Sequence, residues 1–231
     1  MKENCIHVVF VVDESGSMSS SVNDVIGGFK TVVDEQKANK DGTCIVSYYK
    51  FATNVEEVYK GKDVNEVEYL TENNYKPSGL TAMNDGIGTA IDNIGKWLAD
   101  MKEEDRPEKN LVVIITDGEE NNSKEYTIDR VKEMIKHQEE KYSWSFVYLG
   151  TDINDVSYAT RSLGINLAAS NTRASMGDTY AYVNTMLTSY RSTVGDAQTK
   201  GMAFCSAAVA GADKLNEKYE EETGTKVTGL D

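Results

Sequence analysis

Three short stretches of the sequence carry oxygen-bearing side chains at close spacing. The stretch VVFVVDESGSM places Asp13, Ser15 and Ser17 directly after an apolar run. The stretch LVVIITDGEEN places Asp117 after a second apolar run, and SGLTAMNDGI places Thr81 before a helical pattern. Two carboxylates and three hydroxyls, without sulfur or a nearby histidine, are the donor set of a hard divalent cation. The set favours Mg²⁺ or Mn²⁺ in octahedral geometry over Zn²⁺ or copper.

Each of these side chains also has an ordinary structural explanation. Asp13, Ser15 or Ser17 could cap the helix predicted to follow them. Thr81 could likewise be an N-cap, and the Thr-Asp-Gly around Asp117 could be a tight turn. In an open α/β sheet, however, ligands bind at the carboxyl ends of the strands. Three oxygen-bearing loops at one edge of a predicted sheet therefore favour a metal site over three unrelated caps and turns.

The hydrophobic pattern predicts the elements that must position these side chains. Apolar runs predict strands, and apolar residues that recur every three or four positions predict helices. The predicted strands cover residues 8–12, 43–52, 55–61, 110–116, 144–150 and 165–169. The predicted helices centre on residues 22–33, 87–101, 128–135, 152–164 and 176–190.

This order of elements predicts an α/β fold. We expect a doubly wound, mainly parallel sheet with helices on both faces, right-handed crossovers and one antiparallel edge strand, residues 55–61. The apolar stripe fades from Ser192 onward. We therefore predict a domain over residues 1–191 and a C-terminal extension over 192–231. The extension is expected to be partly helical and to pack on the domain or bind a partner, with a frayed end.

The composition limits the classes of partner. The chain has 231 residues, a formal net charge of −14 and a pI near 4.6. Such an acidic surface repels phosphate backbones and anionic lipid, so we expect neither nucleic acid nor a membrane as the partner. No run approaches the roughly 20 apolar residues of a membrane span. Three widely spaced cysteines argue against a disulfide framework and predict a cytoplasmic protein.

The three stretches, in this order and at this spacing, resemble the von Willebrand factor type A domain with a complete metal-ion-dependent adhesion site. The resemblance covers roughly residues 5–190. It implies that the hydroxyl ligands are Ser15, Ser17 and Thr81, and that Asp13 and Asp117 act directly or through water. It also implies that an acidic side chain of a partner protein fills the last coordination position.

The rest of the sequence is similar to the small stand-alone bacterial or phage members of that family. It departs from their pattern at Thr151 and Asp152, within the segment FVYLGTDINDVSYATRSLGI. Glu119 and Glu120 add two acids beside the predicted site, which we interpret as solvated rim residues rather than groups that tune metal affinity.

Three functions follow from this reading. The first is a binding module without enzymatic activity, because the sequence shows no general base or nucleophile–base pair. The second is a metal-assisted hydrolase, for which Glu119 and Glu120 are the spare carboxylates. The third is a scaffold that pairs with a separate AAA+ ATPase, as members of the family do in chelatase-type complexes. The chain itself has no G-x-x-x-x-G-K-[ST] loop.

Overall fold

The computed structural model describes residues 1–117, 120–150, 158–165, 167–170, 176–193, 195 and 197–224. The strands are β1 (Lys2–Asp13), β2 (Thr43–Phe51), β3 (Val55–Asp63), β4 (Pro107–Ile115), β5 (Ser145–Gly150) and β6 (Leu167–Ser170). The α-helices are α1 (Val22–Ala38), α2 (Met83–Asp100), α3 (Ile128–Tyr142), α5 (Met176–Ser192) and α6 (Ala197–Thr223). Shorter helical segments are η1 (Gly16–Ser20), η2 (Val64–Glu66), η3 (Glu103–Asp105) and η4 (Tyr158–Leu163).

The strands form one sheet in the order β3-β2-β1-β4-β5-β6. Every neighbouring pair is parallel except β2 and β3, which are antiparallel. The predicted fold class, a mainly parallel sheet with one antiparallel edge strand and helices on both faces, is confirmed. β1 lies between β2 and β4, so both of its edges are paired, and residues 8–12 are fully buried because helices cover both faces of the sheet.

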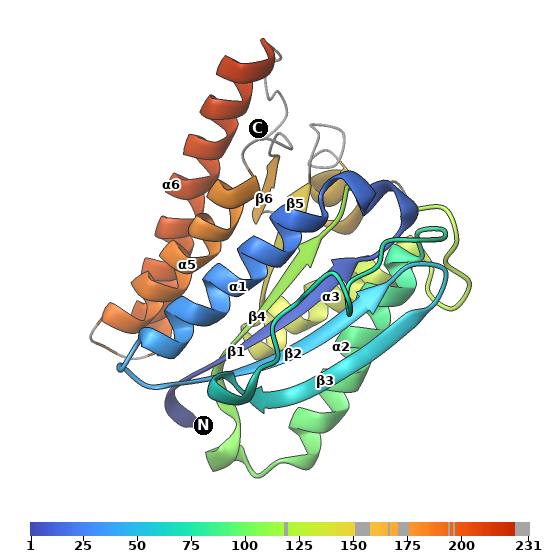
Figure 1. Cartoon of the computed structure of the whole chain (residues 1–231). Helices are drawn as coiled ribbons and strands as arrows, with labels where there is room; N and C mark the ends of the chain where they lie inside the picture. The colour runs from blue at the N-terminus through green and yellow to red at the C-terminus, as the bar shows by residue number, and fades with distance from the viewer. Residues whose placement is uncertain are drawn as a thin grey trace.

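Successive residues of β1 face two different apolar cores. Val8, Phe10 and Val12 belong to the core that includes residues of α1, α5 and α6. Val9 and Val11 belong to the core that includes residues of α2 and α3. Figure 1 shows α1, α5 and α6 on one face of the sheet and α2 and α3 on the other. The alternation of side chains along a strand therefore builds a three-layer α/β/α arrangement.

Two segments before α2 differ from the sequence prediction. β1 begins at Lys2 rather than at residue 8, because Lys2 pairs with Pro107 and Cys5 pairs with Thr43. The polar stretch 61–80 contains η2 and buries Tyr75 against the core on the α1 side. The stretch is mostly polar, so the sequence pattern did not indicate that a few of its apolar residues pack against the core.

Two predictions after β5 fall partly outside the described residues. For the predicted helix over 152–164, the structure describes only 158–165, where η4 has π-helical hydrogen bonding. The departures at Thr151 and Asp152 lie outside the described residues. The last predicted strand, 165–169, corresponds to β6, which begins at Leu167.

The C-terminal segment forms a long helix beside α5. α6 runs along α5 in Figure 1, and its residues Phe204, Ala208 and Leu215 are buried in the same core as Tyr180. Of the predicted frayed end, residues 223–231, the structure describes only Thr223, which is the last residue of α6, and Gly224. The boundary between 191 and 192 stays a prediction. No helix in the described part of the chain is long and apolar enough to cross a membrane.

Candidate metal-binding site

The two predicted carboxylate ligands reach the same edge of the sheet. β1 and β4 are parallel neighbours, and Val12 pairs with Ile115. Asp13 is the last residue of β1, and Asp117 follows the end of β4 by two residues. The parallel pairing therefore brings both residues to the carboxyl end of the sheet, where ligands bind in this class of fold.

Asp13 is fully buried, and both its carboxylate oxygens and its main-chain oxygen accept hydrogen bonds. Its Oδ1 accepts a 2.7 Å hydrogen bond from the main-chain N–H of Ser15, and its Oδ2 accepts a 2.6 Å bond from Thr116 Oγ1. The hydroxyl of Tyr75 donates to the Asp13 main-chain oxygen at 2.7 Å. Burial raises the pKa of the Asp13 carboxyl, the bonds from Thr116 and Ser15 lower it, and the negative charge of Asp117 raises it further. A cation beside these two carboxylates would favour their charged forms.

The hydroxyls of Ser15 and Ser17 meet at the start of the loop. Ser15 Oγ lies 3.0 Å from Ser17 Oγ. Ser15 is buried, whereas Ser17 is exposed, so one hydroxyl of the pair lies in the interior and the other at the surface. Ser15 occupies the N-cap position of η1, but its side chain makes no capping hydrogen bond. Helix α1 begins only at Val22, so neither hydroxyl has the capping role that offered the ordinary explanation.

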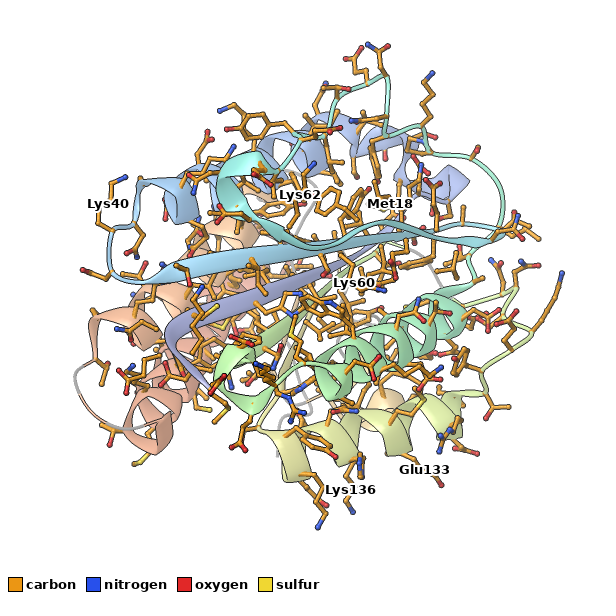
Figure 2. All side chains as sticks on the ribbon, turned by 90° about the horizontal axis from the view of Figure 1, so that it is seen from below. Met18, Lys40, Lys60, Lys62, Glu133 and Lys136 are labelled. Carbon is orange, nitrogen blue, oxygen red and sulfur yellow. The ribbon has the colours of Figure 1, made fainter. Side chains whose placement is uncertain are left out.

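A buried methionine anchors the same loop. Met18, in the middle of η1, is fully buried, and its side chain is labelled in Figure 2. The Ser15 main-chain oxygen accepts a 3.1 Å hydrogen bond from the Met18 N–H. The loop that carries both serines is therefore fixed by the core beneath it rather than by helix capping.

Thr81 lies in the loop before α2 and is buried. The N-cap of α2 is Ala82, so Thr81 does not cap this helix. Its main-chain N–H donates to Asn121 Oδ1 at 2.9 Å, and its oxygen accepts from the N–H groups of Asn121 and Asn122 at 3.0 and 3.1 Å. Thr81 is thus attached to the segment that follows Asp117.

Gly79 connects the Thr81 loop to the serine loop. The Gly16 N–H donates to the Gly79 oxygen at 3.2 Å. Gly79 has a φ of +82°, and a Cβ atom there would lie 2.5 Å from Thr53 Oγ1. Glycine meets both requirements because it accepts a left-handed conformation and has no side chain to clash. A glycine at position 79 is therefore needed where the two loops meet.

Two acidic residues that the sequence analysis did not assign as anchors fix the loop after Asp117. The buried carboxylate of Asp85, in the first turn of α2, accepts from the N–H groups of Lys124, Glu125 and Tyr126 at 2.8–2.9 Å. Glu120 accepts from the N–H groups of Asn84, Asn122 and Ser123 and from the Ser123 hydroxyl.

This arrangement corrects the interpretation of Glu120 as a solvated rim residue, since its carboxylate holds main-chain N–H groups. Glu119 and Gly118 lie outside the described residues. Asp85 could have been found from its place in the motif SGLTAMNDGI, whereas nothing in the sequence singled out Tyr75.

The donor chemistry of the five predicted ligands fits Mg²⁺ or Mn²⁺. An octahedral ion with bonds of about 2.1 Å places neighbouring ligand oxygens about 3.0 Å apart. Ser15 Oγ and Ser17 Oγ are 3.0 Å apart, which equals this edge and also equals an ordinary hydrogen bond. Within the described ranges, no group of three or more His, Cys, Asp or Glu residues could hold a metal. A site here must therefore depend on the hydroxyls together with the two aspartates.

Neither histidine contributes to this edge of the sheet. His7 is buried within β1, where Nδ1 lies 3.1 Å from Asn110 Oδ1 and Nε2 lies 2.8 Å from Ser47 Oγ. His137 lies on α3, where its ring makes an edge contact with Tyr142. Both rings therefore contact neighbouring side chains away from the candidate site.

Comparison with known families identifies the class of protein. The model of the von Willebrand factor type A (VWA) domain family matches residues 7–179. The chain therefore belongs to this family. The matched range contains all five predicted ligands and ends within α5.

Solved structures show the same fold at low sequence identity. The vWF domain of the type V pili tip protein Mfa5 from Porphyromonas gingivalis aligns with a TM-score of 0.61 and 9% identity, over 83% of this chain and 97% of that one. A von Willebrand factor type A protein from Catenulispora acidiphila gives 0.54 and 12%, over 81% of this chain and 43% of the other. Proximal thread matrix protein 1 from the mussel byssus gives 0.52 and 16%, over 78% and 45%. The chain thus spans less than half the length of the last two proteins.

Proposed function

We propose that this VWA domain binds Mg²⁺ or Mn²⁺ and uses the ion to bind an Asp or Glu side chain of a partner protein. The proposed ligands are Asp13, Ser15, Ser17, Thr81 and Asp117. When bound, the ion would supply an electrophilic coordination position for the partner's carboxylate. No covalent bond is made or broken in this function.

The convergence of three loops at one sheet edge carries the proposal. Main-chain hydrogen bonds connect Gly16 to Gly79 and Thr81 to Asn121 and Asn122, so loops far apart in sequence are fixed against each other. The two serine hydroxyls make no capping bonds that would explain them. A preformed oxygen-rich edge of this kind lowers the conformational cost of binding an ion.

Binding is favoured over catalysis by the role of Glu120. A metal-assisted hydrolase would need further carboxylates, and Glu120 was one of two spare candidates. Its oxygens instead accept hydrogen bonds from Asn84, Asn122 and Ser123. The named relatives agree with a binding role, since a pilus tip protein and a thread matrix protein are named for their place in an assembly.

The proposal extends to the setting of the domain. Free thiols at Cys5, Cys44 and Cys205 support a reducing, cytoplasmic location. We further propose residues 1–191 as the binding domain, of the stand-alone bacterial or phage type, and 192–231 as an extension packed on it. A separate AAA+ ATPase is the partner class to test first, with no nucleic acid or membrane involved.

Metal-dependent capture tests the proposed function. The immobilised chain should retain a host protein in Mg²⁺ and release it in EDTA, and Asp117→Ala should retain none. The matched control is Asp105→Ala, an exposed aspartate in η3 before the amino end of β4. Capture that survives EDTA, or that Asp117→Ala retains, contradicts the proposal. An ATPase among the retained proteins would assign the AAA+ partner.

A further inference from the structure

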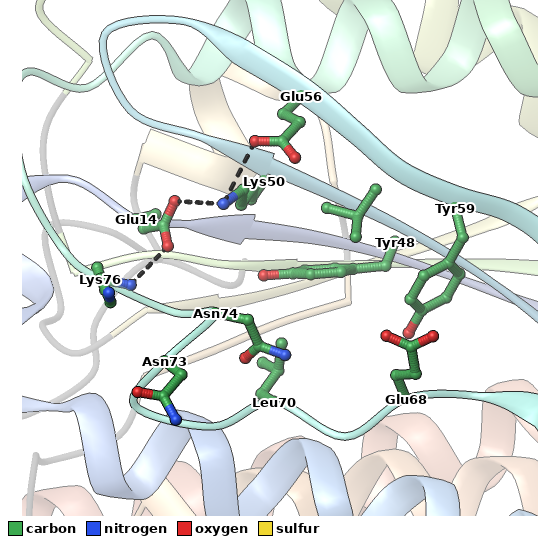
Figure 3. A pocket seen from close by; sticks show the side chains of 11 residues that line it. Glu14, Tyr48, Lys50, Glu56, Tyr59, Glu68, Leu70, Asn73, Asn74 and Lys76 are labelled. Carbon is green, nitrogen blue, oxygen red and sulfur yellow. Dashed lines mark hydrogen bonds and ion pairs between the residues drawn. The ribbon is translucent and has the colours of Figure 1, made fainter.

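A pocket of about 270 Å³ lies beside the candidate metal site and is separate from its predicted ligands. Its lining comes from β2, β3, the residue after β1 and the segment 68–76: Glu14, Tyr48, Lys50, Glu56, Val58, Tyr59, Glu68, Leu70, Asn73, Asn74 and Lys76. Figure 3 shows these side chains around the hollow. The volume lies just below the range of pockets for drug-sized ligands, so it suits one small ring rather than a large cofactor.

Among the described residues, two tyrosine hydroxyls of this pocket lack a hydrogen-bond partner. The hydroxyl oxygens of Tyr48 and Tyr59 are buried, and neither has a partner among the residues that the structure describes. Tyr48 is only 2% exposed. In Figure 3 its ring lies along the pocket with the hydroxyl directed toward the side where Glu14 lies. Unsatisfied buried hydroxyls are costly, so a group that bonds to them is expected in the pocket.

Both phenols stay protonated and can donate. Burial raises the pKa of Tyr48, and the neighbouring Glu14 raises it further. Burial and Glu68 act in the same way on the pKa of Tyr59. Each hydroxyl can therefore donate one hydrogen bond to a ligand oxygen and accept another from a ligand hydroxyl.

The charged groups of the pocket largely balance one another. Lys50 Nζ lies 3.1 Å from Glu14 Oε2 and 3.3 Å from Glu56 Oε2, as the dashed lines in Figure 3 show. Glu68 Oε1 pairs with Lys62 Nζ at 3.4 Å. The lining contains three glutamates and two lysines, so an ionic ligand of either sign would meet like charges as well as opposite ones. A neutral polar ligand finds both hydrogen-bond donors and acceptors there.

We propose that this pocket binds a neutral sugar residue. Each hydroxyl of a sugar is both donor and acceptor, which matches a lining of phenols, amides, carboxylates and ammonium groups. Val58, 41% exposed, and the buried Leu70 offer apolar surface to the C–H groups of the ring. The proposal goes beyond metal-dependent protein binding and does not rest on it.

Amide NMR of the full chain in EDTA tests this proposal without involving the metal site. The probes are methyl glucoside, methyl galactoside, methyl mannoside and N-acetylglucosamine, with sodium glucuronate and arginine as ionic comparisons. With at least one neutral sugar, the amides of Val58, Leu70, Asn73 and Asn74 should shift and saturate. The absence of saturable shifts there with every neutral sugar, or stronger binding of glucuronate or arginine, overturns the proposal.

A pair of neighbouring tyrosines provides the matched variants. Tyr48→Phe removes a hydroxyl that has no described partner, so the variant should fold at least as well as the wild type. It should weaken sugar binding by about 2- to 10-fold, the loss of one hydrogen bond. Tyr49→Phe removes a hydroxyl that donates to Glu57 and does not line the pocket, so sugar affinity should not change. Equal affinities of the two variants contradict the assigned site.

Discussion

Thr116 Oγ1 donates a 2.6 Å hydrogen bond to Asp13 Oδ2 across 103 residues of sequence. Both residues are fully buried, and they lie at the ends of the neighbouring strands β1 and β4. The bond fixes the carboxylate that begins the proposed metal site before any ion is present. The other carboxylate oxygen of Asp13, Oδ1, accepts a 2.7 Å hydrogen bond from the main-chain N–H of Ser15.

Thr116→Val should therefore destabilise the metal-free protein by about 1.5–3 kcal/mol, the usual contribution of a hydrogen bond to a charged group. It should also weaken Mg²⁺ binding, because Asp13 loses its fixed orientation. Urea unfolding in EDTA measures the first effect and a Mg²⁺ titration the second. Thr31→Val removes an exposed hydroxyl bonded to the Gly27 oxygen in α1 and is the control. Equal losses in both variants would contradict a special role for Thr116.

Asp85 provides a second test, because its carboxylate fixes the loop after Asp117 by hydrogen bonds. This loop includes Asn121 and Asn122, which bond to the main chain of Thr81. Asp85→Asn keeps the shape but replaces one accepting oxygen by a donor, opposite the N–H groups of Lys124, Glu125 and Tyr126. We expect a loss of about 2–3 kcal/mol in the free energy of unfolding and weaker Mg²⁺ binding. Asp92→Asn, which affects one 2.9 Å bond from the Tyr126 hydroxyl, should cost at most about 1 kcal/mol and leave Mg²⁺ affinity unchanged. Unchanged Mg²⁺ affinity in Asp85→Asn would remove Asp85 from the positioning of the site.

Much of the fold and of the site follows from local patterns. The apolar runs predicted the central parts of β1, β4 and β5, because these strands are covered on both faces and residues 8–12, 111–115 and 146–149 include no charged residue. The motif residues Asp13, Ser15 and Ser17 were predicted as a group because they lie within five positions of one strand end.

The contacts that fix the loops could not be predicted in the same way. Tyr75 bonds to Asp13 across 62 residues, and Asn121 bonds to Thr81 across 40 residues. Such pairs depend on how the loops meet in space, and polar residues in loops carry no periodic signal. The same reason explains why the role of Glu120 was misread and why the pocket beside β3 was not foreseen.

The packing of α1 against α5 predicts opposite effects at two adjacent glycines. A Cβ atom at Gly28 would lie 1.8 Å from Tyr180 Cδ2, whereas a Cβ atom at Gly27 would meet nothing within 4 Å. Gly28→Ala should destabilise the protein by about 1–3 kcal/mol or more through overpacking. Gly27→Ala should be neutral or stabilise it by up to about 1 kcal/mol, because alanine favours the helix. Urea unfolding compares the two, and a stable Gly28→Ala variant would contradict the close contact of α1 with Tyr180.

The buried ring of His7 should make the folded protein less stable in mild acid. Burial lowers its pKa from 6.5 to about 4, and the hydrogen bond with Asn110 opposes this only in part. The unfolded chain thus binds a proton near pH 6.5 while the folded chain does not, so stability is full above this pH and falls as the pH drops toward 4. The shift corresponds to about 3 kcal/mol. NMR of the His7 ring, assigned with His7→Gln, measures the pKa, and protonation near pH 6.5 in the folded protein would contradict it.

The most direct test of the central claim is thermal unfolding of metal-stripped protein with Mg²⁺, Mn²⁺ or Ca²⁺, beside Asp117→Ala and Asp105→Ala. At a hundredfold excess over the dissociation constant, binding to the folded state adds about 2.7 kcal/mol, or about 5–10 °C for a chain of this length. We predict this shift for the wild type and Asp105→Ala with Mg²⁺ or Mn²⁺, and none for Asp117→Ala. No shift with any cation, or an equal shift in Asp117→Ala, would contradict a metal site formed by these residues.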